Sequence, residues 1–177
     1  RLYAAAGSFR AKATRSAWFP AASGGAMSQL TVRNPDFEAV VRASFAQQGL
    51  MSHLGATLRT VAPGAVEVEV GFRDELTQQQ GFFHGAVTTA IADTACGYSA
   101  LTLMPAGSEV LSVEFKINLF APARGERLIA RGQVIRSGRT ITVCHGDVYA
   151  VTGGLAGGVE SHCATMTATM IRVDLGS

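Results

Sequence analysis

The chain has 177 residues, 47% of them hydrophobic, which is enough for one domain built around one core. Its formal net charge of +2 is unevenly divided, because residues 1–26 hold four of the 15 basic side chains and none of the 13 acidic ones, so that the remainder carries −2. That remainder lacks the basic excess that duplex binding requires, and nucleic acid is not an expected partner.

The first segment, residues 1–26, is rich in Ala, Ser and Arg and contains no acid. This composition is typical of transit peptides, and equally of a tail left by cloning or upstream translation. The segment contains no long apolar run, so a secretory signal is not expected. We predict a flexible tail over 1–26 and a single domain over 27–177, with Met27 as the natural start.

The next elements are a helix and a hairpin. Apolar residues at helical spacing predict an amphipathic surface helix over 36–48. From Val66 onward the apolar period changes to two, which predicts a half-buried strand over 66–73 with Phe72 on its buried face. The turn residues Ala62-Pro63-Gly64 precede it, so its hairpin partner is expected over 54–61.

Residues 84–104 differ from the rest of the chain, because they are too long for a strand and contain no Lys, Arg or Glu. A helix that is apolar on nearly every face must be buried on nearly every face. A transmembrane span is the alternative, but Asp93 in the middle of the segment would be costly in a bilayer. The sequence therefore predicts an α+β fold in which a curved antiparallel sheet wraps a central helix.

Four segments after this helix have strand character and short connections, so an antiparallel meander is expected. They span residues 110–120, 126–136, 139–151 and 161–173. The three cysteines, Cys96, Cys144 and Cys163, are odd in number and show no metal-ligand spacing. We expect buried free thiols, no metal, and a reducing compartment such as the cytoplasm.

Asp93 is the only ionised side chain of the central helix, and its helical neighbours at three and four residues are small and neutral. Burying a lone carboxylate costs several kcal/mol. Asp93 therefore either faces water on a polar strip or serves as an unpaired acid in a cleft, which marks a candidate site.

The start of the helix adds a second chemical element. Free backbone N–H groups at a helix N-terminus can hold a developing oxyanion, and Gly85 lets a ligand approach that backbone closely. Gln78 belongs to a run of three glutamines whose amides could orient a water. For His84 the alternatives are substrate binding and a capping role, since no Ser or Cys nucleophile stands beside it.

Several stretches of the chain resemble the hotdog-fold acyl-CoA thioesterases of the PaaI-like (phenylacetic acid degradation-related) family. They are Gly81-Phe82-Phe83-His84-Gly85-Ala86, Ala90-Ile91-Ala92-Asp93-Thr94-Ala95, Ser112-Val113-Glu114-Phe115-Lys116-Ile117-Asn118, Pro122-Ala123-Arg124-Gly125-Glu126 and Arg136-Ser137-Gly138-Arg139-Thr140. The resemblance covers about residues 37–173. It implies a long central helix wrapped by five or six antiparallel strands, and a homodimer with shared active sites that pairs into a homotetramer.

The resemblance also implies roles for individual residues. Asp93 corresponds to the nucleophile or general base, and the Gly85 N–H to the group that polarises the thioester carbonyl. Gln78 would place water or substrate, and Ser112 would support the water. The candidate substrate contacts are His84, Phe83, Asn118, Arg124, Arg136 and Arg139, the three arginines toward the phosphates of coenzyme A, with Phe82 and Met51 as further guesses at the pocket wall.

Two departures from the family pattern matter. Ala86 replaces the second glycine of the usual His-Gly-Gly and narrows the approach, while Gly97 replaces a Thr of another branch and favours the PaaI-like one. The expected reaction is hydrolysis of an acyl or aryl thioester without a separate cofactor, because coenzyme A is part of the substrate. The alternatives are an enoyl or hydroxyacyl-thioester hydratase and a non-catalytic acyl-CoA-binding protein on the same fold.

Overall fold

The computed structural model describes residues 30–154 and 158–174; the predicted tail over 1–26 lies outside the described residues. The helices of the described ranges are α1 (Phe37–Ala46), α2 (Gly49–Leu54), the 3-10 turn η1 (Asp74–Leu76) and α3 (Gly85–Leu101). The strands are β1 (Ala56–Ala62), β2 (Ala65–Gly71), β3 (Ser108–Leu119), β4 (Arg127–Ser137), β5 (Ile141–Thr152) and β6 (Val159–Asp174).

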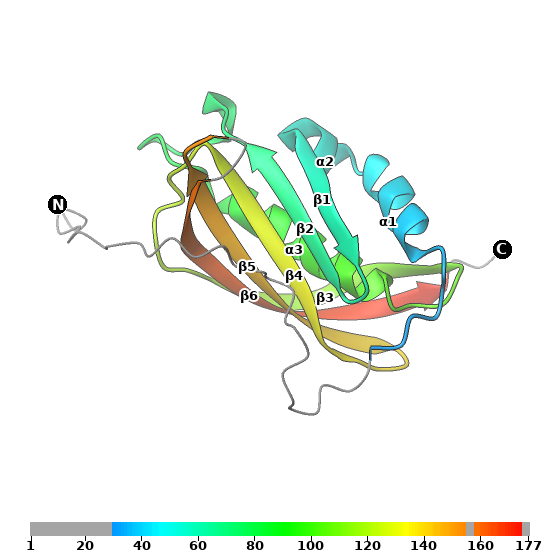
Figure 1. Ribbon diagram of the computed structural model, residues 1–177. Helices are drawn as coiled ribbons and strands as arrows, with labels where there is room; N and C mark the ends of the chain where they lie inside the picture. The colour runs from blue at the N-terminus through cyan, green and yellow to red at the C-terminus, as the bar shows by residue number, and fades with distance from the viewer. Residues whose placement is uncertain (1–29, 155–157, 175–177) are drawn as a thin grey trace.

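These strands form one six-stranded antiparallel sheet in the order β1-β2-β4-β5-β6-β3. The sheet is strongly curved, and α3 lies across its concave side while α1 and α2 lie beside β1 (Figure 1). Helix α3 contacts every strand of the sheet. This arrangement confirms the predicted α+β hotdog architecture of a long central helix wrapped by a curved antiparallel sheet.

The predicted meander is right for β4, β5 and β6 and wrong for β3. Strand β3 pairs with β6 and forms one edge of the sheet, although β4 follows it in the chain. The connection over 120–126 can reach about 23 Å when extended, whereas three strand spacings amount to only about 15 Å. A short connection therefore does not require that the two strands it joins are neighbours.

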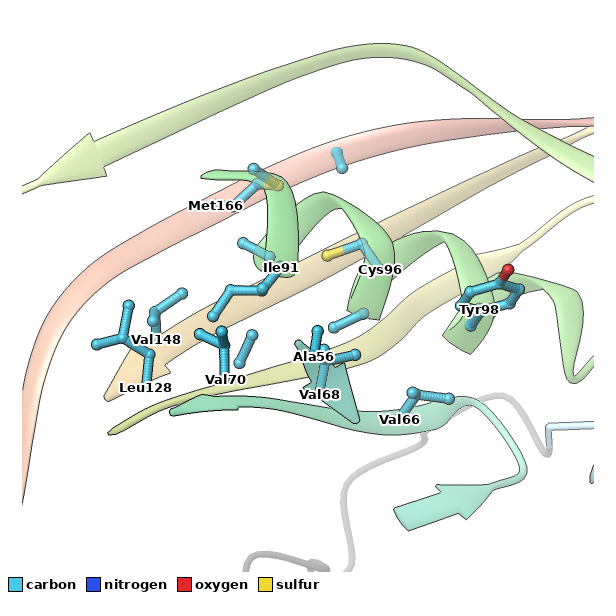
Figure 2. Close-up of a cluster of buried hydrophobic side chains, with 14 of the residues drawn as sticks. Ala56, Val66, Val68, Val70, Ile91, Cys96, Tyr98, Leu128, Val148 and Met166 are labelled. Atoms are coloured by element: carbon cyan, nitrogen blue, oxygen red, sulfur yellow. The ribbon is translucent and has the colours of Figure 1, made fainter. Parts of the chain in front are cut away.

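The core lies between α3 and the sheet. Figure 2 shows Ile91 of α3 among side chains from three strands, and Ile91, Val70, Leu128 and Val148 are all 0% exposed. Full burial of each such side chain stabilises the fold by about 1.5–3 kcal/mol relative to its exposure. The apolar helix thus supplies one half of the core and the strands the other.

Two glycines explain how closely α3 approaches the sheet. Gly132 of β4 and Gly146 of β5 are opposite each other in the ladder. A side chain at Gly132 would overlap the carbonyl of Ala95, and a Cβ at Gly146 would lie 2.8 Å from the Cys96 sulfur. The helix backbone therefore packs directly onto these two strands.

The segment before β1 contains a helix that the sequence pattern did not predict. Helix α2 begins at Gly49 and ends at Leu54, the residue with which the predicted first strand begins. Met51 and Leu54, three residues apart, are both buried, and Gly55 ends the helix in the left-handed conformation with φ 66°. Six residues are fewer than two helical turns, which gives too few repeats for the apolar period to be recognised in the sequence.

Cys96, Cys144 and Cys163 are free and buried, as predicted. Burial raises the pKa of all three thiols, that of Cys144 to about 12 and that of Cys163 to about 11. Cys96 is therefore a protonated packing residue rather than a nucleophile, despite its position one turn from Asp93. In the ranges 30–154 and 158–174, none of the helices combines the length and the apolar character needed to cross a membrane.

Candidate active site

Asp93 lies on the strip of α3 that remains at least partly exposed. The other members of this strip are Gly85, Ala86, Thr89 and Ala90, whereas Val87, Thr88 and every other residue of α3 from Ile91 to Leu101 are buried. Positions three and four residues apart share one helix face. Asp93 thus ends a strip of small side chains that leaves its carboxylate open to an approaching molecule.

Strand β3 brings Ser112 to this carboxylate. The Ser112 hydroxyl donates to Asp93 Oδ1 at 2.6 Å, and the same Oγ lies 3.5 Å from the Met170 sulfur. Within the described residues this is the one hydrogen bond that the Asp93 side chain accepts, and no cation pairs with it. One carboxylate oxygen is therefore oriented by Ser112 while the other remains available for reaction.

The start of α3 provides an unpaired donor. His84 is the N-cap, and its Nδ1 accepts the Ala86 N–H at 2.9 Å, which makes it a capping residue. The Gly85 N–H has no acceptor among the residues described, and N–H groups of a first helical turn point outward along the helix axis. The geometry therefore offers a free donor, with the positive end of the helix dipole behind it, at the position predicted for carbonyl binding.

Gly85 and Asp93 cannot act on the same carbonyl within one chain. Eight residues at a rise of 1.5 Å separate the two groups by about 12 Å along the helix axis. A reacting carbonyl needs both the nucleophile and the oxyanion donor within about 3–3.5 Å of its atoms. A single copy of the chain thus presents two candidate half-sites, one at Asp93 and one at the Gly85 N–H.

The glutamine and phenylalanines predicted for the site lie near the start of α3. The Gln78 amide is turned into its own loop, where its Oε1 accepts the Gln80 N–H and its Nε2 donates to Gln80 Oε1 at 3.1 Å. Phe83 is buried, at 3% exposure, and packs edge-on against Phe72 at 5.4 Å between ring centroids. Phe72 itself is 39% exposed beyond the end of β2, so its predicted place on the buried face is wrong.

The three predicted arginines divide between the two ends of the sheet. Arg124 lies at the start of α3, with its guanidinium 4.9 Å from the centre of the Phe82 ring. Arg136 and Arg139 lie where β4 ends and the turn to β5 begins, about 30 Å away along the strand. One chain therefore does not gather these cations around one ligand.

Two further candidates are placed away from Asp93. Asn118 pairs in register with Thr165, and both lie on the convex face of the sheet, whereas their neighbours Leu119 and Ala164 lie on the concave face. Met51 is 1% exposed and belongs to the core, so it does not line a pocket wall. The contribution of Asn118 to substrate binding stays a prediction.

Sequence reasoning missed one residue at the helix start, Leu119. Regular alternation along β3 would place Leu119 and Ser112 on opposite faces, but the ladder shifts by one residue between Ser112 and Glu114 and puts both toward α3. A Cβ added to Gly85 would lie 2.9 Å from Leu119 Cδ1, so these residues are in contact. No feature of the sequence marks this bulge.

The chain is similar to known thioesterases. Residues 80–156 match the family model of the thioesterase superfamily. The solved structure of a thioesterase family protein from Silicibacter pomeroyi is 43% identical, with a TM-score of 0.74 over 78% of this chain and 98% of that one.

Two other proteins extend the comparison. Human acyl-coenzyme A thioesterase 13 is 30% identical over 93 residues, which are 52% of this chain and 66% of that protein. The E. coli PaaI protein from the phenylacetic acid degradation operon has a TM-score of 0.67 over 80% of this chain and 96% of its own, at 16% identity, and supports the fold alone.

Proposed function

Because this chain belongs to the thioesterase superfamily and is a thioester hydrolase, we propose that its substrate is an acyl-coenzyme A, which it cleaves to the free acid and coenzyme A. The observation that carries the proposal is the state of Asp93. It is a partly exposed carboxylate on an otherwise buried helix, oriented by Ser112 at 2.6 Å and paired with no cation in the described part of the chain. Such an acid is available as a nucleophile or base.

In the proposed reaction Asp93 attacks the thioester carbonyl carbon directly or removes a proton from a water that does so. The carbonyl double bond opens to an oxyanion, which the Gly85 N–H and the helix dipole stabilise. When the carbonyl re-forms, the C–S bond breaks and coenzyme A leaves as a thiolate, which takes up the proton that Asp93 removed from water or, after a direct attack, a proton from solvent. A direct attack leaves an anhydride of Asp93, which water then hydrolyses to the acid. No metal and no cofactor other than the substrate's own coenzyme A takes part.

The edge of the sheet at β3 supports a homodimer as the active form. This edge strand is long and exposes Leu111, Val113, Phe115 and Leu119 at 58, 54, 42 and 53%. An exposed apolar edge strand is a template for pairing with another chain. Two β3 strands that pair antiparallel about a two-fold axis near Phe115 would place the first half of one strand beside the second half of the other.

This pairing would complete the two half-sites. Ser112 holds Asp93 near the middle of β3, and Leu119 contacts Gly85 at its end. Across the two-fold axis, Asp93 of one chain would therefore lie near the partner's Gly85. The proposal includes two further points. The family resemblance supports the pairing of two dimers into a homotetramer, and the buried free thiols support a cytoplasmic location.

The same symmetry would bring the divided arginines together. The turn between β4 and β5 lies beside the beginning of β3, since the Arg172 N–H donates to Thr140 O at 2.8 Å and Arg172 pairs with Val110. The partner's turn, with its Arg136 and Arg139, would then approach the end at which Arg124 lies. Three cations would face the phosphates of coenzyme A.

The test is a panel of acyl-CoA substrates with a thiol reagent that detects released coenzyme A. We expect hydrolysis by the wild-type protein and a fall in kcat of about 10²–10⁴-fold for Asp93→Asn, with smaller losses for Ser112→Ala and Gln78→Ala. Asp36→Asn, the same change at an exposed position before α1, is the matched control. Full activity in Asp93→Asn would refute its role. Hydration of an enoyl-CoA without released thiol would indicate a hydratase, and binding without turnover an acyl-CoA-binding protein.

A further inference from the structure

Leu119 occupies an unusual position at the end of β3. Its partner in the ladder is Ala164, a fully buried residue whose small side chain leaves space on the concave face. The leucine side chain extends from there over the first turn of α3 and contacts Gly85. The absence of a side chain at Gly85 is what permits this contact, because an added Cβ would come within 2.9 Å of Leu119 Cδ1.

Despite this contact, Leu119 is 53% exposed, whereas Leu128 on the same face of the sheet is fully buried. An apolar side chain that contacts Gly85 and keeps an uncovered side can form one wall of the site at the start of α3, which in the proposed dimer the partner strand completes. A carbonyl oxygen bound to the Gly85 N–H would lie about 2.9 Å from that nitrogen. The carbon bonded to the carbonyl carbon would then lie close to the first turn of α3, which Leu119 contacts at Gly85.

We infer that Leu119 is a specificity-determining residue, which selects acyl groups by the bulk of the carbon next to the thioester carbonyl. The inference rests on the proposed acyl-CoA hydrolase function and concerns the same site. A straight acyl chain presents a CH₂ group at that carbon, whereas a branched chain presents an additional methyl group against Leu119. Wild-type protein therefore favours straight over branched acyl groups, and a smaller residue at 119 relaxes this preference.

The experiment compares butyryl-CoA with isobutyryl-CoA, two isomers of which the first has a straight acyl chain and the second branches at the carbon next to the carbonyl. The measured quantity is the ratio of kcat/KM for isobutyryl-CoA to that for butyryl-CoA. Leu119→Ala should raise this ratio about tenfold, the low end of what one methyl group contributes in an apolar pocket. Leu119→Val should raise it by a smaller factor, and Leu119→Phe should lower it.

Leu50→Ala is the matched control, since Leu50 is 57% exposed and belongs to α2, which packs beside β1 at the edge of the sheet opposite to β3. Its ratio should equal that of the wild type. Analytical ultracentrifugation should show that each variant has the same oligomeric state as the wild-type protein. If Leu119→Ala does not fold, the opposite shifts expected for Val and Phe decide the question.

A purely structural role would lower kcat/KM for both substrates by the same factor and leave the ratio unchanged. That result, in a wild-type background that hydrolyses butyryl-CoA, would overturn the role of Leu119 and leave the proposed function intact. A wild-type protein that releases no thiol from any acyl-CoA would overturn both.

Discussion

The proposed division of the active site between two chains predicts that two inactive variants restore each other. Gly85→Pro removes the N–H donor without breaking α3, because Pro is favoured at the first helical position. The preceding residue, His84, already has φ −65° and ψ 139°, the extended conformation that a following Pro requires. Loss of one oxyanion donor should lower kcat about 10²–10³-fold. Asp93→Asn should lower it by a similar or larger factor.

In a heterodimer of the two variants, one site combines an intact Gly85 with the partner's intact Asp93, and the other site has neither. The purified heterodimer should therefore recover about half of the wild-type activity per dimer, while both parent homodimers stay inactive. Co-expression with two different affinity tags and sequential purification isolates the heterodimer, and thiol release measures its turnover.

The control for this experiment is Gly85→Ala. It adds the same Cβ, which the flexible end of Leu119 can avoid, and it keeps the N–H. Its homodimer should remain active, whereas a loss equal to that of Gly85→Pro would mean that crowding, not the donor, matters. A heterodimer as inactive as its parents would refute the shared site and the 12 Å argument on which it rests.

Two further predictions concern the fold. Gly132→Ala forces a side chain onto the Ala95 carbonyl and should destabilise the protein by about 1–3 kcal/mol, which thermal unfolding would show as a lower Tm. Gly71→Ala is the control, because no atom lies within 4 Å of the added Cβ, and its Tm should not fall. The raised thiol pKa values predict that the protein loses stability in alkali. Below the ordinary thiol pKa of 9.0, the Cys144 thiol is protonated in both the folded and the unfolded chain. Above that pH the thiol ionises in the unfolded chain but stays protonated in the folded one until its folded pKa of about 12, so the free energy of unfolding falls as the pH rises. Urea unfolding between pH 8 and 10.5 should show a falling free energy of unfolding, with a smaller slope in Cys144→Ala; equal slopes in the two proteins would contradict this.

Local patterns were sufficient where one face of an element decides its environment. The absence of Lys, Arg and Glu from 84–104 predicted the buried helix, and Asp93 could be recognised as the exception within it. The observed α3 and its burial confirm this. The second helix, α2, was missed because its six residues carry too little periodicity.

The family resemblance named residues, but only tertiary structure could place them. Ser112 meets Asp93, and Leu119 meets Gly85, because a bulge in β3 changes which side chains face the helix. Neither the bulge nor the pairing of β3 with β6 follows from alternation along a strand, since both depend on contacts between distant segments.

The sequence by itself determined that an apolar helix must be the centre of the molecule and that one carboxylate on it required an explanation. Burial energetics act on each face of each element, so this information is local and can be read residue by residue. The tertiary structure alone decided that β3 is an exposed edge and that Gly85 and Asp93 are too far apart to serve one carbonyl. Those facts depend on helix rise, strand order and chain reach in three dimensions, and together they are the basis for proposing a site shared by two chains.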